Sequence, residues 1–440
     1  MTPSAKKIRK HLSADALFQL VRTGMEKIDE TAKIKPAINI SDILMSGFAL
    51  FSLKDPSLLA FDERRKIDKN LGQIYHIDNI PCDTQMRTRL DEVTPTQISP
   101  LFKDVFRQLQ RGKALEQYVY MNGCYLLSLD GTGYFSSDKI HCESCLEKRH
   151  KKTGKISYSH QMLGAAIVHP DLKTVIPLAP EPIIKQDGQE KNDCERNASK
   201  RFFKQLRQDH PHLKLIIVED ALSSNAPHIR DLQRHKFHWI LGVKKGDHPF
   251  LFQYVDDAHK AGKVTEFEFE LNGTIHRFRF LNDVPLNASN QDLLVNFVEY
   301  WEIKPHKTQH FSWVTGFKVR KDNVYNIMRG GRARWKIENE TFNTIKNQGY
   351  HFEHNYGHGK KNLSVVFAYL MMLAFLVDQA QQLACGLFQA VWKEVGSKIR
   401  LWERIRSLFQ DLEFDSMEHL YNALLYGYKI NGFVIFNDSS

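Results

Sequence analysis

Three acidic residues occupy positions where a charge is poorly suited to packing. Asp130 ends a predicted strand, LLSLD, Asp220 ends another, LIIVED, and Glu338 lies on a predicted helix well downstream. A carboxylate at the end of a buried strand is partly desolvated without contributing apolar contacts. Each aspartate alone is also compatible with a turn-initiating residue. Together, in the order strand, strand, helix, the three acids fit the oxygen ligands of a pair of hard divalent cations in phosphoryl transfer.

The segment RGGRARWKIENETFNTIK, residues 329–346, is predicted to form one amphipathic helix that carries two glutamates. Its apolar stripe consists of Trp335, Phe342 and Ile345. At about 100° per residue, Glu338 lies on this stripe, which must face the core. Glu340 is rotated from Glu338 by about 200° and is predicted to face solvent or Lys336. Helical geometry therefore favours Glu338 as the ligand.

The chain around the two aspartates is predicted to alternate between strands and helices. Short apolar or β-branched runs bounded by Gly, Pro, Asp and Asn predict strands at residues 124–130, 160–170, 173–183, 213–220 and 237–244. A helix is predicted over residues 194–208, and another follows Asp220. The residues GTG after Asp130 are predicted to be a turn. Strands and helices in this order indicate an α/β domain with a mixed sheet.

Helices are predicted on both sides of this domain. In the N-terminal region, helix starts are predicted at Ser13, at Ser41 and at Ser99 with Pro100. Alternating polar and apolar residues predict four more strands between residues 248 and 325, and a helical tail follows from residue 362. The most apolar run, residues 363–377, is shorter than the about 20 residues that a bilayer span needs, so we expect a buried helix.

Composition indicates a folded, basic protein. Hydrophobic residues make up 42% of the 440 residues, enough for a sizeable core in two or three domains. The 61 Lys and Arg residues against 51 Asp and Glu give a net charge of +10, and the basic residues recur in clusters. Such clusters fit an extended polyanion as partner, or a set of solvated faces. The six cysteines are irregularly spaced and no secretory signal is recognisable, so we expect a cytoplasmic protein without membrane association.

Three segments of the chain resemble the catalytic segments of DDE transposases of bacterial insertion sequences, in the group with a β-strand insertion in a ribonuclease H-like domain. They are LSLDGTGYFSS, IIVEDALSSNAPHIRDLQRHKFHWILGVK and RARWKIENETFNTIK, and the resemblance covers residues 126–361. It implies a ribonuclease H-like mixed-sheet core with an all-β insertion. It also implies that Asp130, Asp220 and Glu338 are the catalytic, metal-binding triad, with two Mg²⁺ ions, replaceable by Mn²⁺, as cofactors.

The resemblance further implies a function and a domain organisation. The protein would be a DNA transposase that binds the inverted-repeat ends of an insertion sequence and carries out strand cleavage and strand transfer in cut-and-paste transposition. Its partners would be double-stranded DNA, as element ends and as target, and a second copy of the chain in a DNA-bound synaptic complex. The expected regions are an N-terminal helical end-binding region (1–112), two parts of the ribonuclease H-like core (113–247 and 329–380), the β-strand insertion (248–328) and a C-terminal helical region (381–440).

The third segment matches part of that group's signature, which runs Tyr, two residues, Arg, three residues, Glu, six residues, Lys. Arg334 and Glu338 fit, but Gly331 stands at the Tyr position and Lys346 comes one residue late. On a regular helix one residue turns a side chain by about 100°, so Lys346 reaches the usual position only if the helix is locally irregular. The residues expected to contact DNA are Arg334, Lys336, Lys346, Lys360, Lys361, Lys200 and Arg201.

The same segments admit two other functions. A structure-specific nuclease on the same fold would cut DNA but not join it, and the long predicted insertion weighs mildly against it. A catalytically inactive DNA-binding protein derived from a transposase is compatible with the altered Tyr and Lys positions, although all three acids are present.

Cys142 and Cys145 form a Cys-x-x-Cys pair that could hold a zinc ion together with nearby histidines. The histidines close in sequence are His141, His150 and His160. A second cysteine pair at suitable spacing is missing, so reduced surface thiols are the alternative. The run LEKRHKKTGK, residues 146–155, is predicted to be a basic loop. GYHFEHNYGHGKKN, residues 349–362, is predicted to be a loop that either lies against a DNA backbone or is simply exposed.

Overall fold

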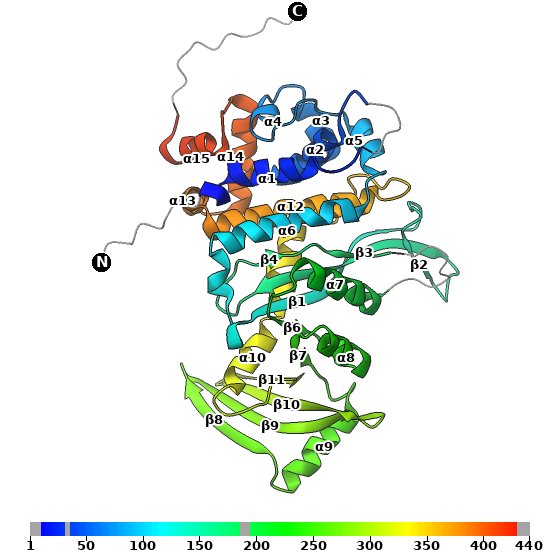
Figure 1. Cartoon of the computed structure of the whole chain (residues 1–440), viewed down its shortest axis with the longest axis vertical. Coiled ribbons are helices and arrows are strands. Elements are labelled where there is room, and N and C mark those ends of the chain that lie inside the picture. The colour runs from blue at the N-terminus through cyan, green and yellow to red at the C-terminus, as the bar shows by residue number, and fades with distance from the viewer. Residues whose placement is uncertain (1–9, 31–35, 185–193, 429–440) are drawn as a thin grey trace, which may run out of the picture.

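In the part of the chain that the structure describes, an 11-stranded mixed sheet forms the centre (Figure 1). The computed structural model describes residues 10–30, 36–184 and 194–428. The strands follow one another across the sheet in the order β2-β3-β1-β6-β7-β11-β10-β9-β8, and β4 and β5 pair with β3. They are β1 (Tyr125–Ser137), β2 (Leu146–Arg149), β3 (Ile156–Val168), β4 (Ile176–Pro177), β5 (Glu181–Ile183), β6 (Leu215–Glu219), β7 (His238–Gly242), β8 (Thr265–Leu271), β9 (Thr274–Asn287), β10 (Asn290–Lys304) and β11 (Lys307–Thr315).

The pairing directions divide the sheet into two parts. β1 runs parallel to β6 and β6 parallel to β7, whereas β3 is antiparallel to β1. Beyond β7 the strands β11, β10, β9 and β8 are all antiparallel to their neighbours. The predicted mixed α/β fold is therefore confirmed, and the four strands predicted between residues 248 and 325 are present as β8 to β11.

Helices from both ends of the chain form a layer above the sheet in Figure 1. They are α1 (Ala14–Met25), α2 (Ile40–Ser52), α3 (Leu58–Arg64), α4 (Asn70–Gln73), α5 (Asp83–Leu90), α6 (Pro95–Arg111), α12 (Leu363–Ala384), α13 (Gly386–Val395), α14 (Lys398–Asp411) and α15 (Met417–Tyr426). The helices nearer the sheet are α7 (Glu195–Asp209), α8 (Ala226–Arg234), α9 (Pro249–Lys260), α10 (Val324–Arg332) and α11 (Asn343–Asn347). Because α12 packs against α2 and α6, the two ends of the chain share one core.

α12 is long and apolar enough to cross a membrane by length and composition alone, with a mean hydropathy of 1.9. Its whole apolar window is nevertheless buried inside the structure, as expected for a core helix. Near its end Asp378 forms a buried ion pair with Lys54, which follows α2, and accepts a hydrogen bond from the Tyr350 hydroxyl. Lys54 Nζ also lies 3.7 Å from the centre of the Trp402 ring.

The helix starts of the N-terminal region agree only in part with the sequence predictions. Ser13 caps α1, as predicted. α2 begins one residue before Ser41, which therefore lies inside the helix and does not cap it. α6 begins directly after Thr94, because Thr94 and Gln97 form a capping box, so the start predicted at Ser99 is wrong.

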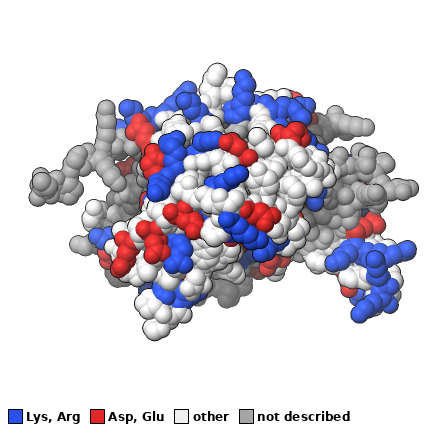
Figure 2. All heavy atoms as spheres, turned by 90° about the horizontal axis from the view of Figure 1, so that it is seen from below, with Lys and Arg blue, Asp and Glu red and all other residues white. Residues whose placement is uncertain are grey.

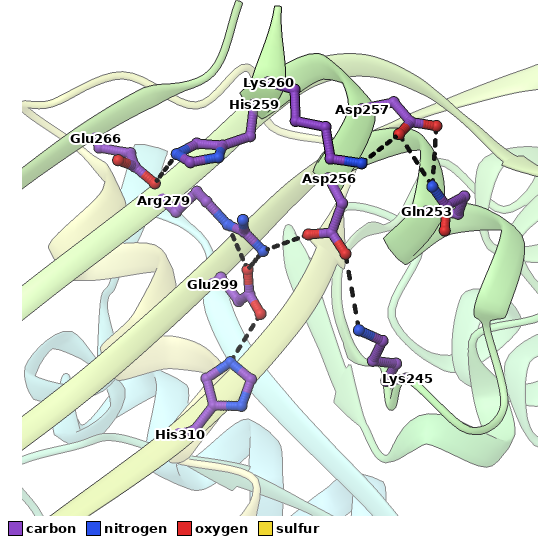
Figure 3. Close-up of polar contacts among 10 residues, drawn as sticks. All are labelled: Lys245, Gln253, Asp256, Asp257, His259, Lys260, Glu266, Arg279, Glu299 and His310. Atoms are coloured by element: carbon purple, nitrogen blue, oxygen red, sulfur yellow. Dashed lines mark hydrogen bonds and ion pairs between the residues drawn. The ribbon is translucent and has the colours of Figure 1, made fainter. Parts of the chain in front are cut away.

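Charged side chains tie α9 to the antiparallel strands (Figure 3). Arg279 on β9 lies 2.5 Å from Glu299 on β10 and 3.2 Å from Asp256 on α9. Glu299 also lies 2.8 Å from His310 on β11, and Asp256 lies 3.7 Å from Lys245. Seen from below, this end of the molecule carries basic and acidic side chains that intermingle (Figure 2). The net positive charge is therefore not gathered at this end.

Replacing Lys54 with methionine should destabilise the protein strongly. Lys54→Met leaves Asp378 buried without its cation, and breaking a buried pair in this way costs about 3–5 kcal/mol. The measurement is the free energy of unfolding in urea. Lys69→Met is the matched control, because Lys69 pairs with Glu413 in an exposed ion pair worth about 1 kcal/mol or less. Equal effects of the two substitutions would contradict a structural role for the buried pair.

Candidate functional site

The sheet brings Asp130 and Asp220 to one edge of the parallel pair β1 and β6. Ser128 pairs with Val218, and the pairing of these strands stops there. Asp130 and Asp220 each lie two residues further along, so they occupy matching positions just beyond the last pair. Asp220 begins a 3-10 turn, η4 (Ala221–Ser223), and accepts the Leu222 N–H at 2.9 Å.

β1 does not end at Asp130, and the turn predicted at GTG is wrong. The strand continues to Ser137, with Asp130 opposite Gly164 of β3. The register shifts between Gly133 and Phe135, which marks a β-bulge. Because β3 extends β1 beyond the end of β6, Asp130 lies in the middle of one strand pair and past the end of the other. Its carboxylate is thereby left at the edge that Asp220 also occupies.

The single helix predicted over residues 329–346 is interrupted. α10 ends at Arg332, a turn follows, and the chain passes through a π-helical turn, Ile337–Phe342, into α11. Within this turn the Asn343 N–H donates to the Glu338 carbonyl, five residues back. Isolated π-helical turns of this kind are frequent at functional sites.

The interruption changes which side chains face the core. Phe342 and Ile345 are buried, as predicted, but Trp335 is 49% exposed, so the prediction that it faces the core is wrong. A π-helical turn holds one more residue than an α-helical turn, and this shifts the phase of every later side chain. Lys346, which comes one residue late for a regular helix, is thereby moved back toward the face that the signature requires. Lys346 Nζ pairs with Glu353 at 2.8 Å.

Two close contacts hold the segment from Arg334 to Phe342, here called the Glu338 segment, against the sheet. The Phe342 ring lies over Gly164, where a Cβ atom would come within 2.6 Å of the ring. Because Gly164 pairs with Asp130, this contact sets how closely the π-helical turn approaches Asp130. The Ser128 hydroxyl donates to the Arg334 carbonyl at 3.0 Å and fixes the start of the same segment.

Gly331, at the Tyr position of the signature, lies against Trp313 of β11. A Cβ atom at Gly331 would be 2.4 Å from the Trp313 indole nitrogen, and Trp313 is 5% exposed. A tyrosine at this position would clash with the indole. The departure from the signature therefore has a packing cause in this chain.

Arg334 holds two of the acids together. Its Nη1 lies 2.7 Å from Glu338 Oε1 and 3.2 Å from Asp130 Oδ2. Burial, with the Glu338 and Glu195 carboxylates nearby, raises the pKa of Asp130 to about 7, although Arg334 acts in the opposite direction. The guanidinium thus offsets only part of the negative charge, and a further cation would be stabilised here.

Glu195 is a fourth carboxylate at this place, and sequence analysis does not identify it. It is the first residue of α7, and its side chain lies over Gly131, where a Cβ atom would be 2.0 Å from Glu195 Oε1. Partial burial, together with Asp220 and Glu219, raises the pKa of Glu195. The glycine directly after Asp130 is the signal that could have indicated it, because it leaves room for a side chain from another element.

A cavity of about 300 Å³ opens beside these acids. Its lining includes Asp130, Gln161, Glu195, Ser199, Glu219, Asp220, Ser223 and His228. His228 Nε2 lies 2.6 Å from Glu219 Oε2, and both side chains are buried. Burial alone would lower the pKa of His228, but the Glu219 carboxylate raises it. Glu219 is a further acid at this site and His228 is its close partner, and sequence analysis identifies neither of them.

Glu340 lies apart from the carboxylate cluster formed by Asp130, Asp220, Glu195 and Glu338. Burial lowers the pKa of Lys336 and of Lys398, and the Glu340 carboxylate acts against that shift at both lysines. Glu340 therefore faces basic neighbours, as predicted, whereas Glu338 faces Asp130 through Arg334.

The residues expected to contact DNA differ in their surroundings. Lys200 and Lys360 are exposed, and Lys336 is partly buried. Ion pairs engage three of the others: Lys346 with Glu353 at 2.8 Å, Lys361 with Glu92 at 2.8 Å and Arg201 with Glu181 at 2.5 Å. Partly or fully exposed ion pairs contribute little stability, so a phosphate can replace the carboxylate at such a cation.

The donor set of the carboxylate cluster fits Mg²⁺ or Mn²⁺. Asp130, Asp220, Glu195 and Glu338 offer oxygen atoms alone, which hard divalent cations prefer. These four carboxylates carry more negative charge than the single Arg334 guanidinium that pairs with two of them can offset. A divalent cation held there, beside the cavity, would be positioned for chemistry at a phosphate.

Comparisons with known proteins give a structural likeness but no match to a family model or a curated protein. Among solved structures it is similar to a piggyBac transposase, determined by cryo-EM as a synaptic complex with hairpin DNA. The identity is 10%, the match covers 98% of this chain and 85% of the other, and the TM-score is 0.37. A likeness this distant transfers neither fold nor function to this chain.

Removing the charge of Glu195 should weaken divalent cation binding. Because Glu195 reaches over Gly131 beside Asp130, Glu195→Gln is expected to raise the dissociation constant for Mn²⁺ by about tenfold or more. Gly131→Ala should act in the same direction, since the new methyl group would displace Glu195 without removing its charge. Electron paramagnetic resonance of free Mn²⁺ during titration gives the constants.

Glu340→Gln is the matched control for this titration, because it makes the same change outside the cluster. Its dissociation constant should equal that of the unmutated protein. Unchanged affinity in Glu195→Gln and Gly131→Ala would exclude Glu195 from the cation site.

Proposed function

We propose that the protein is a DNA transposase of the DDE type, which cuts DNA at the ends of its own element and joins those ends to target DNA. One observation carries the proposal: Arg334 contacts both Asp130 and Glu338, while Asp220 lies at the matching position on the next parallel strand. The contacts of Arg334 and the strand register support a site built from these three acids, which lie far apart in the sequence. Under this proposal β3, β1, β6 and β7 belong to a ribonuclease H-like core, and β8 to β11 are its insertion.

The proposed catalytic residues are Asp130, Asp220 and Glu338, which would hold two Mg²⁺ ions. Ions held by these carboxylates would supply Lewis-acid chemistry: activation of a water or 3′-hydroxyl and stabilisation of the leaving 3′-oxygen at phosphorus. Arg334 holds Asp130 and Glu338 close together, so the ligands are positioned before substrate arrives. Glu195 would add a further carboxylate ligand beside Asp130, since its side chain lies over Gly131.

Basic side chains near this site would orient the DNA backbone. Lys346 follows the Glu338 segment, and the π-helical turn brings its phase toward that of Glu338. Lys360 and Lys200 are exposed, so each is free to approach a phosphate. End recognition by the N-terminal helices and pairing of two ends by a homodimer complete the proposal.

A cleavage assay with matched variants tests the proposal. The purified chain is mixed with Mg²⁺ and a supercoiled plasmid that carries the inverted repeats flanking its own gene, and nicks and breaks are mapped on both strands. Asp130→Asn and Glu338→Gln should reduce cleavage by about 10²-fold or more, because each removes a charge that the metal site needs. Glu340→Gln, two residues from Glu338, should cut normally.

The outcomes of this assay separate the candidate functions. Cuts at the repeat ends followed by joined products support a transposase. Cuts without joining indicate a structure-specific nuclease. Repeat binding without cleavage, in both Mg²⁺ and Mn²⁺, would refute the enzymatic proposal and indicate a DNA-binding protein.

Lys360→Ala should weaken binding to any double-stranded DNA. If Lys360 neutralises one phosphate, the slope of log K against log salt concentration should become shallower by about one. Fluorescence anisotropy over a salt series measures this slope. Lys260→Ala on α9, a similarly exposed lysine among the contacts of Figure 3, is the control and should leave the slope unchanged. Equal slopes for both variants would place the DNA elsewhere.

A further inference from the structure

Four side chains with metal-binding atoms meet where the sheet faces the loop before α12. They are Cys142 and Cys145 between β1 and β2, His160 on β3, and His358 in the loop that follows α11. Their ligand atoms all lie within 4.8 Å of one another. We propose that these four residues form a structural zinc site, which fixes the β2–β3 hairpin to the loop ahead of α12.

Four of the six distances between the ligand atoms fit a tetrahedral ion. A zinc bonded at about 2.3 Å to sulfur and about 2.0 Å to nitrogen separates its ligand atoms by roughly 3.3–3.8 Å. The two sulfurs are 3.8 Å apart, His160 Nε2 lies 3.3 and 3.4 Å from Cys142 Sγ and Cys145 Sγ, and His358 Nε2 lies 3.3 Å from Cys145 Sγ. Two thiolates and two imidazoles also match the ligand preference of Zn²⁺.

Hydrogen bonding alone explains this cluster poorly. His160 Nε2 has one lone pair, yet two thiols approach it at nearly equal distances, and only one of them can donate to it. A central cation instead contacts all four atoms at once. Zinc binding would release the two thiol protons to solvent and leave two thiolates on the ion.

The surroundings resemble those of a closed structural site. Cys145, His160 and His358 are buried, and Cys142 is partly buried. The Tyr134 ring stacks on the His160 ring, with 5.7 Å between their centres, and the Phe135 ring lies 4.3 Å from that of His358. These apolar rings keep water from the ligands. A structural zinc needs no open coordination position, and the four protein ligands here leave none.

The structure also selects among the histidines that lie near the cysteine pair in sequence. His141 is exposed and stacks on the Tyr158 ring, and His150 Nε2 lies 3.0 Å from the Ser157 hydroxyl. Neither belongs to the cluster, whereas His160 does. His358 comes from 213 residues beyond Cys145, so local spacing could not identify it as the fourth ligand.

The proposed ion would complete a clamp on the loop before α12. On one side the Asp91 carboxylate accepts four backbone N–H groups, at 2.9–3.0 Å, from Lys360, Lys361, Asn362 and Leu363. On the other side the Glu143 N–H donates to the Lys360 carbonyl and the Ser144 hydroxyl to the Lys361 carbonyl, at 3.2 and 3.1 Å. Zinc would add coordination bonds to the hydrogen bonds that already join the hairpin to the loop.

The hairpin that the ion would fix is strongly basic. The predicted basic loop over residues 146–155 is wrong in its first half, which forms β2. The exposed Lys and Arg residues of this run are Lys148, Arg149, Lys151, Lys152 and Lys155. The hairpin lies at the right of Figure 1, and Lys and Arg cover the part that projects at the right of Figure 2. A role for this arm on DNA rests on the proposed function, but the zinc site itself does not.

Metal analysis of the full chain tests the site directly. The protein is purified without added metal or chelator, and its metal content is measured by plasma mass spectrometry. We expect about one zinc per chain, and a thiolate-to-metal charge-transfer band after exchange with Co²⁺. Cys145→Ser and His358→Ala should each lose the bound zinc and the band.

Two matched variants control for general effects of mutation. His141→Ala removes an exposed histidine next to Cys142, and Cys82→Ser removes a thiol at the start of α5; both should retain the zinc. If Cys145→Ser or His358→Ala fails to fold, the unmutated protein still decides the matter through its zinc content and cobalt spectrum. Zinc-free protein with no cobalt band, or a Cys142–Cys145 disulfide in the purified chain, would overturn the proposal.

Failure of the zinc site and failure of the proposed function are distinguishable, because the metal assays contain no DNA. Zinc bound by the four ligands in a chain that never cleaves the repeats leaves the site intact and refutes the transposase. Cleavage by a chain that binds no zinc refutes the site alone. Zinc retained in His358→Ala would refute the ligand set.

Discussion

The accumulation of negative charge at the end of β6 is the constraint on which the rest of the structure depends. Asp130, Asp220, Glu195, Glu219 and Glu338 are brought close together, Arg334 pairs with Asp130 and Glu338, and His228 contacts Glu219. Such acids repel one another, so rigid packing of their backbones must hold them in place. Burial, and after it the neighbouring Glu338 and Glu195 carboxylates, raise the pKa of Asp130 to about 7. A divalent cation would offset the negative charge that Arg334 leaves uncompensated.

Packing holds the cluster through contacts that leave little freedom. The Phe342 ring occupies the space above Gly164 and Glu195 the space above Gly131, and in both cases a β-carbon would collide with the incoming side chain. The two glycines flank Asp130 on its own strand and on the neighbouring one, so Glu338 and Glu195 approach Asp130 from separate elements. On the side of the helical layer, the Tyr369 hydroxyl of α12 donates to the Pro180 carbonyl, and α12 packs in turn on α2 and α6. The helical layer therefore supports the strands that carry the acids.

Much of this arrangement could be predicted from the sequence. The predictions that were wrong, and the site residues that were missed, share a physical cause. Hydrophobic periodicity locates β6, β7 and β8 to β11, because those strands are bounded by clear turn residues. The GTG after Asp130 looks like a turn, yet β3 pairs with it and makes it strand. The helix around Glu338 has a uniform amphipathic pattern, and nothing local in it reveals the break after Arg332 or the π-helical turn that follows. Glu195, His228 and His358 are also missed, since each acts through a contact with a distant part of the chain. Local patterns thus predict the elements, whereas contacts between elements decide the site.

The same distinction explains why the β2–β3 hairpin needs an anchor from outside itself. Its exposed lysines and arginine repel one another, and a short hairpin that extends beyond the body of a sheet buries too few apolar groups to order itself. Four ligand atoms around one ion could supply the missing constraint, as metals do in domains too small for a core. One ligand, His358, lies in the loop that joins the Glu338 segment to α12, and Asp91 holds that loop from the opposite side. If zinc fixes the basic β2–β3 hairpin to this loop, the hairpin would move as one body with the carboxylates. A phosphate bound by the hairpin would then keep its position relative to Asp130 and Glu338.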